Sequence, residues 1–345
     1  MSHLIFVPAT AAPDAGADIA RQTAVTLERI DARLRADRSS LADAAVVNVY
    51  LRRASDFPAM NEAYRQAWKA APPTRTTVVV DPQTAGADVE MSAVAVPAGS
   101  DRRVVHPSSW MASPNPYSYG IRAGSTLFLS GLIPRNGKDN TVVSGDVATQ
   151  TRAVLDNAKE LLDAAGLSFS HLVSARVFLP DVKNFAELNR VYRELVGPDR
   201  PARATVGASL TSPAYTVEMT FVASAAARQG IDADPEKSPN LTPAVRVGGT
   251  LFVSGLLADG DAAAAGPAAQ TRDIFRKLDA LLSKAGFARA DVRDLLVYVT
   301  DEEAAKGAMA ECRAAFGEKA SITPVKVALV AAGARVEIMT LAERG

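Results

Sequence analysis

Cysteine, aromatic residues and long apolar runs are all scarce in this sequence of 345 residues. Its single cysteine, Cys312, excludes an internal disulfide framework, and this usage favours a reducing compartment. No apolar stretch approaches the roughly 20 residues that a membrane-spanning helix needs. The N-terminus has no basic segment ahead of its short apolar run, which is not typical of a secretory signal. We therefore expect a cytoplasmic protein.

An excess of charge of either sign is also missing. Lys and Arg total 38, and so do Asp and Glu, so the net charge gives no indication of nucleic-acid or membrane binding. The sequence has no His, Cys, Asp and Glu cluster at metal-ligand spacing, and it lacks a Walker loop or a dinucleotide fingerprint. We expect no metal and no organic cofactor, and the expected partner is a small molecule or another protein.

What the sequence does contain is one stretch repeated three times. An amphipathic helical pattern opens with a Gln-Thr pair at Gln22, Gln150 and Gln270. In the second copy the apolar positions have helical spacing and predict one buried face; they are Val154, Leu155, Ala158, Leu161 and Leu162. We interpret the Gln-Thr pair as structural.

Each repeated helix is followed by a strand, a second helix and two further strands. Repeats two and three also carry a hairpin ahead of the first helix, with an apolar strand that ends in Ser-Gly, whereas repeat one has only the second strand of that hairpin. The unit is therefore β-β-α-β-α-β-β, an α+β layer with helices on one face of a sheet. We place the repeats at residues 1–99, 112–226 and 239–345, separated by linkers rich in Pro, Gly, Ser and charge.

Repeat two carries the most specific motifs. It reads NPYSYGIRAGSTLFLSGLIP, then ATQTRAVLDNAKELLDAAG, then PARATV and YTVEMTFVA. This pattern resembles the Rid family, also called YjgF, whose archetypes are imine and enamine deaminases. Family members are single domains assembled as homotrimers, with a central barrel, helices outside and ligand clefts between neighbours. Three repeats in one chain then imply a monomeric pseudo-trimer, and a dimer of such rings is the alternative.

The resemblance also implies roles for individual residues. Arg203 of the PAR motif corresponds to the arginine that holds a substrate carboxylate, and Glu218 to the glutamate that holds or activates water. Tyr117 matches the pocket tyrosine, and we count these three as the catalytic residues. Gly131 and Asn189 match further substrate-binding positions. The alternatives are that Arg203 caps a strand or pairs with a carboxylate, and that Glu218 is simply its buried partner.

The other two repeats are less complete. Repeat one has Arg75, Glu90 and Asn61 at the matching substrate-binding positions, but no tyrosine, and Ala9 stands in place of the glycine. Repeat three keeps Gly255 and Glu337 and has no motif arginine; Leu241 replaces the tyrosine, and Lys326 lies too far along its strand to substitute. We expect at most two acid-binding clefts, with the Arg203 cleft as the more active one and the Arg75 cleft dependent on a neighbouring repeat.

The reaction implied by the resemblance is hydrolytic deamination of a small 2-imino or 2-enamino acid. Water adds to the C=N carbon and ammonia leaves. Two other functions stay open: a non-catalytic carboxylate-binding or protein-interaction module on the same fold and, more remotely, a ring-opening amidohydrolase or chorismate-type lyase with three lobes.

Overall fold

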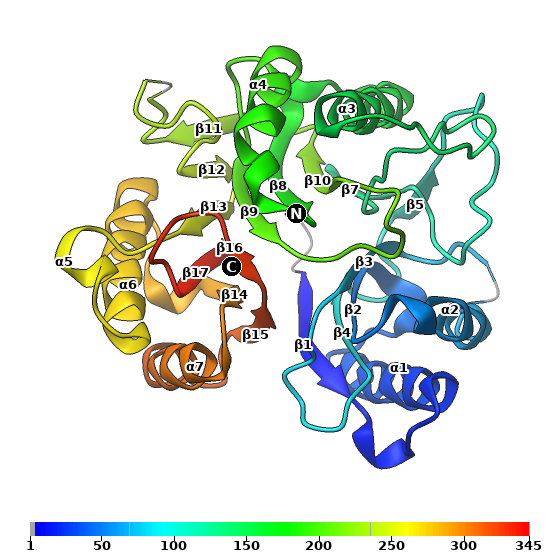
Figure 1. Ribbon diagram of the computed structural model, residues 1–345, viewed down its shortest axis with the longest axis horizontal. Helices are drawn as coiled ribbons and strands as arrows, with labels where there is room; N and C mark the ends of the chain where they lie inside the picture. Colours follow the sequence, from blue (N-terminus) through cyan, green and yellow to red (C-terminus); the bar gives the residue numbers. More distant parts are fainter. Residues whose placement is uncertain (1–3, 69, 235, 345) are drawn as a thin grey trace.

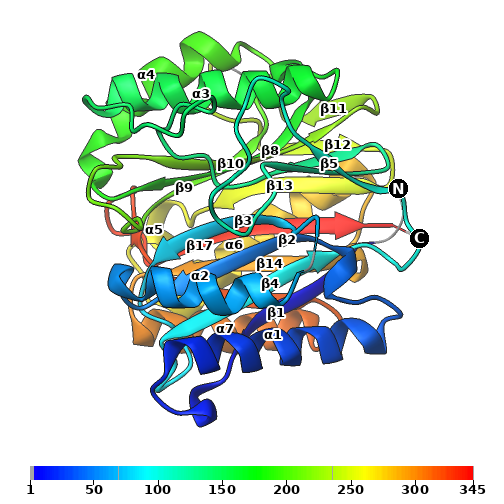
Figure 2. The ribbon, with the colours of Figure 1, turned by 90° about the vertical axis from the view of Figure 1, so that its right-hand side faces the viewer.

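The computed structural model describes residues 4–68, 70–234 and 236–344, which form three lobes around one axis (Figure 1). In each lobe a sheet faces the axis and two long helices cover its outer side, and the view from the side shows the same layers (Figure 2). The fold is therefore α+β with three tandem lobes, as the repeats predict.

Lobe 1 contains four strands and two helices. In chain order they are β1 (Ile5–Ala11), α1 (Ile19–Ala36), β2 (Ala44–Leu51), α2 (Phe57–Gln66), β3 (Thr74–Val79) and β4 (Val89–Ala95). The sheet order is β1-β4-β2-β3, and only β2 and β3 run parallel. The helix α1 begins at Asp18, whose carboxylate accepts hydrogen bonds from the amides of Ala20 and Arg21.

Lobe 2 has two more strands ahead of its first helix. Its elements are β5 (Arg102–Val105), β6 (Gly120–Ala123), β7 (Thr126–Leu129), α3 (Val147–Ala164), β8 (Leu172–Leu179), α4 (Phe185–Val196), β9 (Ala202–Gly207) and β10 (Glu218–Ser224). The sheet order is β9-β8-β10-β7-β6-β5, with a short strand of lobe 3, β16 (Ala328–Leu329), added beside β9.

Lobe 3 repeats this plan. Its elements are β11 (Arg228–Ile231), β12 (Ala244–Val247), β13 (Thr250–Leu256), α5 (Gly260–Ala263), α6 (Pro267–Ala285), β14 (Val292–Val299), α7 (Glu302–Phe316), β15 (Ser321–Lys326), β16 and β17 (Val336–Glu343). Its own sheet has the order β11-β12-β13-β17-β14-β15. The strands β5 and β11 lie in segments that we interpreted as linkers. Each forms a hairpin with the next strand, so that interpretation was wrong.

Each lobe has its own core between sheet and helices. In lobe 2, the predicted apolar face of α3 is buried against that core, which confirms the helical pattern. A further core lies at the axis and receives side chains from all three lobes, including Tyr50, Phe178 and Tyr298 at matching positions on β2, β8 and β14. Burial of this shared apolar surface joins the lobes into one unit. Three sheets surround this core, and the pairing of β16 with β9 and the bridge between Val79 and Ser209 connect neighbouring lobes.

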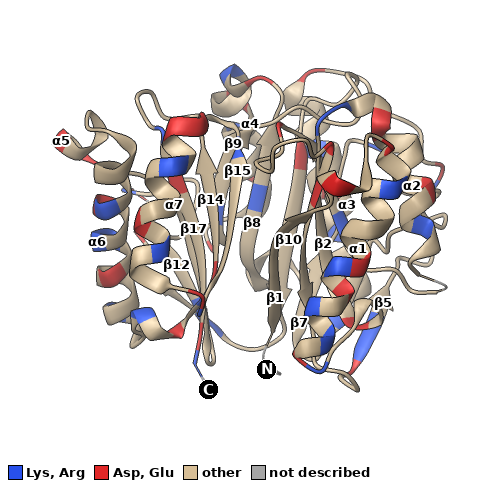
Figure 3. Cartoon of the chain, turned by 90° about the horizontal axis from the view of Figure 1, so that it is seen from below, with Lys and Arg blue, Asp and Glu red and all other residues tan. Residues whose placement is uncertain are grey.

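The charged residues lie mostly on the outer helices and loops, while the strands carry few (Figure 3). This distribution matches the solvated faces of amphipathic helices. Within the described residues, no helix combines the length and the apolar character required to cross a bilayer.

We expect the full-length chain to behave in solution as a particle with the mass of one chain. The reason is that every lobe already packs against two neighbours from the same chain, so the axial core is complete without a second molecule. Light scattering after size-exclusion chromatography measures this mass. A stable particle of three chains would contradict the prediction.

Candidate active site

Arg75 on β3 has a buried side chain at the seam between lobe 1 and lobe 2. Its guanidinium carbon lies 4.9 Å from the ring centre of Tyr64, 5.3 Å from that of Tyr117 and 5.5 Å from that of Phe57. The residue is only 4% exposed, and its Nη1 atom has no hydrogen-bond partner. Aromatic faces stabilise a cation, but they accept few of its N–H groups. A buried donor without a partner is costly, so the site favours an anionic ligand.

The backbone of Arg75 is held by lobe 2. Its amide donates a hydrogen bond of 2.9 Å to Ser130 Oγ, and its carbonyl accepts one of 2.9 Å from the Gly131 amide. Ser130 Oγ in turn donates to the carbonyl of Ser118. The Ser-Gly pair at the end of an apolar strand therefore connects the two lobes at the arginine. We noted that pair as a recurring motif and assigned no role to its serine.

Glu218, the first residue of β10, lies in the same seam. The carboxyl group lies close to Gly131: a Cβ atom at position 131 would lie 1.9 Å from Glu218 Oε1, so a side chain there would displace the carboxyl group. Burial raises the pKa of Glu218 to about 8, although a backbone hydrogen bond from Thr77 and the charge of Arg75 lower it in part. At neutral pH this group is largely a neutral acid, able to donate a proton.

Tyr117 and Asn61 complete this group of residues, which we call the lobe 1/2 cleft: Arg75 and Asn61 from lobe 1 with Tyr117, Gly131 and Glu218 from lobe 2. Asn61 Nδ2 donates to Asn115 Oδ1 over 3.2 Å, which also joins the two lobes. Burial raises the pKa of Tyr117, so its hydroxyl stays protonated. The cleft combines a cation, a neutral acid and a phenol on aromatic walls.

Beside Gly131 a small cavity extends the lobe 1/2 cleft. Trp110, Tyr119 and Arg135 are among its lining residues. Trp110 packs edge-on against Tyr119 at 4.9 Å, and Arg135 Nε donates to Tyr215 Oη over 2.6 Å. The sequence analysis missed these residues. Trp110 lies in a segment that we took for a linker, and its position gave no periodic signal.

Arg203 lies at the corresponding seam between lobe 2 and lobe 3. It is 2% exposed, with its guanidinium carbon 4.5 Å from the ring centre of Tyr192. Its Nη2 atom donates to Asn189 Oδ1 over 2.6 Å, whereas Nε and Nη1 have no partner. Its amide donates to Ser254 Oγ, the counterpart of Ser130. Burial lowers the pKa of this guanidinium, as it does for Arg75.

The residues opposite Arg203 come from lobe 3, and we call this group the lobe 2/3 cleft. Glu337 takes the position of Glu218, since a Cβ atom on Gly255 would lie 1.8 Å from Glu337 Oε1. Burial raises the pKa of Glu337 to about 8, and Arg203 lowers it in part. Leu241 stands where Tyr117 stands in the other cleft, three residues ahead of the first strand of the hairpin. This cleft has the cation and the acid without the phenol.

The expected grouping around Arg203 is therefore wrong. Arg203 and Asn189 face Glu337 and Gly255, while Tyr117, Gly131 and Glu218 face Arg75 and Asn61. Glu218 is not the buried partner of Arg203. Residues that are neighbours within one repeat lie in different clefts, because each cleft is built from the helix side of one lobe and the hairpin side of the next.

In the described part of the chain, the seam between lobe 3 and lobe 1 has no arginine at the matching position. The pairing of β14 with β15 puts Ile322 where Arg75 and Arg203 lie in the other lobes. Ala9 donates its amide to Thr323 Oγ1. The carboxyl oxygens of Glu90 accept hydrogen bonds from the amides of Gln83 and Thr84 in its own lobe, so we no longer assign Glu90 to substrate binding. Lys326 pairs with Asp81 at 2.8 Å instead of replacing the arginine.

The repeated glutamine positions the glutamate of each lobe. Gln150 is buried; its Nε2 donates to the Val143 and Ala214 carbonyls, and its Oε1 accepts from the amide and hydroxyl of Thr216. Thr216 stands two residues before Glu218. Gln22 and Gln270 hold the amides of Asp88 and Arg335 in the same way. The Gln-Thr pair is thus structural, because its glutamine fixes the backbone just before the strand that carries the glutamate.

Among residues 4–68, 70–234 and 236–344, no three His, Cys, Asp or Glu side chains are grouped so that they could hold a metal ion.

Two acid-binding sites per chain follow from this geometry. We expect calorimetric titration with pyruvate to give two sites of unequal affinity, because a carboxylate buried without a cation costs several kcal/mol and the third seam has none. Arg75→Ala and Arg203→Ala should each remove one site. Three equivalent sites, or two sites that survive both substitutions, would contradict the assignment.

Comparison with known proteins agrees with the three repeats. The sequence profile of the family described as Endoribonuclease L-PSP matches residues 7–97, 108–225 and 232–344. A RutC family protein of Pyrococcus horikoshii is 41% identical over 108 residues, which are 31% of this chain and 86% of that protein. Protein DfrA of Myxococcus xanthus is 38% identical over 124 residues, 35% of this chain and 95% of the relative.

Among solved structures, a YjgF family protein of Neisseria meningitidis is 32% identical, with 36% of this chain and 95% of that chain covered and a TM-score of 0.31. Each of these relatives corresponds to about one lobe. The three family matches confirm the resemblance to the Rid (YjgF) family. Because the three matched segments account for most of its length, this chain belongs to the Endoribonuclease L-PSP family, with the family domain present three times.

Proposed function

We propose that this protein hydrolyses small 2-imino or 2-enamino acids to 2-keto acids and ammonia, in the lobe 1/2 cleft. The observation that carries the proposal is the pair formed by Arg75 and Glu218. A buried guanidinium with an unpartnered N–H shares a cleft with a carboxyl group whose pKa is raised to about 8. The cation suits a carboxylate ligand and the acid suits proton transfer to it.

Arg75 provides the binding half of this mechanism. A planar guanidinium donates two parallel hydrogen bonds to a carboxylate, and the aromatic rings around it exclude water from the contact. The carboxylate replaces the missing partner of Nη1 and neutralises the buried charge. This contact directs the C2 atom of the substrate toward the opposite wall, where Tyr117 and Glu218 lie.

Glu218 provides the chemical half. Water adds to C2 of the imine, and the C=N electron pair moves to the nitrogen as the new C–O bond forms. The nitrogen takes one proton of this water, which gives the carbinolamine. The neutral Glu218 acid then protonates the amino group, the C–N bond breaks and ammonia leaves. The carbinolamine hydroxyl returns its proton to Glu218 as the C=O bond forms. Enamine substrates tautomerise to the imine first.

The lobe 2/3 cleft favours the second candidate function, acid binding with little turnover. Arg203 and Glu337 are present there, but Leu241 replaces the phenol and Asn189 already accepts one guanidinium N–H. A cleft that keeps its cation and loses a polar wall still binds a carboxylate. We assign catalysis to the lobe 1/2 cleft, which contains Arg75, and acid binding to the lobe 2/3 cleft, which contains Arg203.

Substitutions of the two arginines test this assignment. We expect Arg75→Ala to lower kcat/KM for imines generated in situ by an amino-acid oxidase by at least about a hundredfold, since truncating a buried charge partner costs roughly 3 kcal/mol. Arg75→Lys should lose most of the rate as well, because it lacks the two-pronged contact. Ammonia release is the readout.

Arg203→Ala is the matched control, because it removes a guanidinium of equal burial from the neighbouring seam. We expect it to change kcat/KM less than about threefold. Thermal unfolding of all variants checks that the seams stay intact. A greater loss in Arg203→Ala would place catalysis in the lobe 2/3 cleft, and an equal loss in both variants would contradict the assignment of catalysis to a single cleft.

The pH dependence tests Glu218 as the proton donor. The protonated form is the active one, so kcat/KM should be level below the pKa and fall about tenfold per pH unit as the pH rises above about 8. Glu218→Gln should lower the rate and abolish that fall, while any titration of the substrate itself persists in both proteins. A rate that instead rises through pH 8 would identify Glu218 as a general base.

A further inference from the structure

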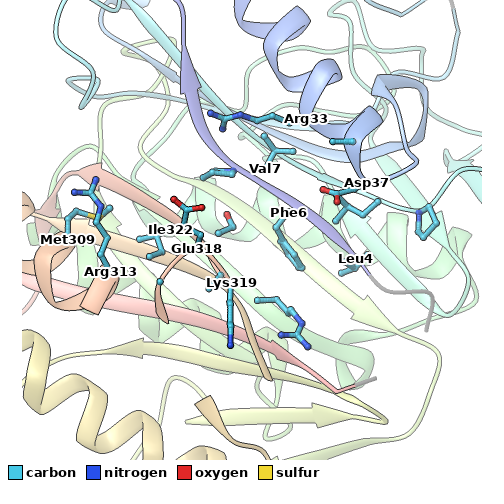
Figure 4. Close-up of a pocket in the computed structure, with 18 residues that line it drawn as sticks. Leu4, Phe6, Val7, Arg33, Asp37, Met309, Arg313, Glu318, Lys319 and Ile322 are labelled. Carbon is cyan, nitrogen blue, oxygen red and sulfur yellow. The ribbon is translucent and has the colours of Figure 1, made fainter. Parts of the chain in front are cut away.

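The seam between lobe 3 and lobe 1 contains a groove of about 1180 Å³ (Figure 4). Leu4, Phe6 and Val7 of the N-terminal segment line one side. Residues of α7 and the start of β15 line the other, including Arg313 and Ile322. The groove occurs beside the edge of β1, which among the described residues has no counterpart of β6 or β12 paired to it.

The equivalence of the three lobes shows what would fill this groove. Phe6, Phe128 and Phe252 occupy matching places on β1, β7 and β13, opposite Val94, Val222 and Leu341. In lobes 2 and 3 a further strand pairs there, with Ile121 opposite Phe128 and Val245 opposite Phe252. Among the described residues, β1 pairs with β4 alone. Phe128 and Phe252 are buried, whereas Phe6 remains half-buried.

The groove also differs from the other two seams in the residues of the preceding lobe on which the hairpin strand packs, which we call the floor. The hairpin strand of lobe 2 packs on Ala45 and Val46 of lobe 1, and that of lobe 3 packs on Val173 and Ala202 of lobe 2. The positions that match Val173 and Ala202 in lobe 3 are Arg293 and Ser321. Asp294 takes the position of Val46. A strand in this groove therefore meets a polar floor that carries one cation, Arg293, and one carboxyl group, Asp294.

The lining as a whole has an excess of positive charge. Its charged residues are Arg33, Arg293, Arg313 and Lys319 against Asp37 and Glu318. None of the four cations forms an ion pair within the part of the chain that the structure describes. An extended segment with carboxylates facing inward would supply those partners. A second copy of this chain would present β1, which has no acidic residue, so its charge does not fit.

We propose that this groove binds an extended acidic segment of a partner protein, which adds a strand to the free edge of β1. Strand addition supplies the backbone hydrogen bonds, and carboxylates at alternate positions of the segment face Arg293 and the cations of α7. Leu4 and Ala9 already donate their amides to Glu343 and Thr323, so the added strand lies between these two points.

A labelled synthetic peptide tests the proposal. The peptide copies residues 241–250 with glutamate in place of Val245 and Val247, the two side chains that face the floor in the lobe 2/3 seam. We expect this peptide to bind one site per chain by fluorescence anisotropy, more weakly as salt is added. The same peptide with lysine at those two positions should bind at least about tenfold more weakly.

Charge reversals locate the binding. Arg293→Glu and Arg313→Glu should each weaken the acidic peptide at least about fivefold. Lys306→Glu, on the same helix as Arg313 but outside the groove, is the matched control and should change binding less than about twofold. Hydrogen exchange should show slower exchange in β1 on binding.

Three outcomes would overturn the proposal. They are equal binding of the acidic and basic peptides, an equal loss of binding in Lys306→Glu, and unchanged exchange in β1. A dimer of whole chains that Arg313→Glu dissociates would also overturn it and assign the groove to a second copy. None of these readouts depends on deaminase activity.

Discussion

Two hydrogen bonds across a seam, between the backbone of Arg75 and the Ser130–Gly131 pair, are the contact on which the candidate active site depends. They hold the arginine strand of lobe 1 against the hairpin strand of lobe 2, so the guanidinium and the Glu218 carboxyl are brought together by backbone geometry. Gly131 is required because the carboxyl occupies the space of its missing side chain. The shared axial core then keeps the lobes in this arrangement.

Each seam is built from residues of two lobes, and in this chain every lobe has its own sequence. A substitution in a homotrimer changes all three clefts, whereas a substitution in this chain changes one cleft, so the three seams can differ. At the third seam the arginine position holds Ile322, the glycine position holds Ala9, and Glu90 bonds to its own loop. The open edge of β1 lies at the same seam, where the described residues of lobe 1 include no counterpart of β6 or of the segment ahead of it that carries Tyr117.

The order of the elements and the buried helix faces could be predicted from the sequence, because they depend on the local spacing of apolar residues. The buried polar residues could also be selected, since Arg75, Arg203, Glu218 and Glu337 stand in motifs. Their grouping could not be predicted, because Glu218 follows Arg203 by fifteen residues in the chain and yet faces Arg75. The strands β5 and β11 were missed as well, since their pairing depends on a hairpin partner and not on their own pattern.

The sequence by itself determined that this chain has three α+β units, that two of them carry the arginine and that the third has none. These properties are written residue by residue and need no knowledge of distant contacts. Only the tertiary structure decided which arginine meets which acid, and which seam is left open. Those outcomes depend on how one lobe packs against the next, and the acid that Arg75 or Arg203 meets follows that arginine by more than a hundred residues in the chain.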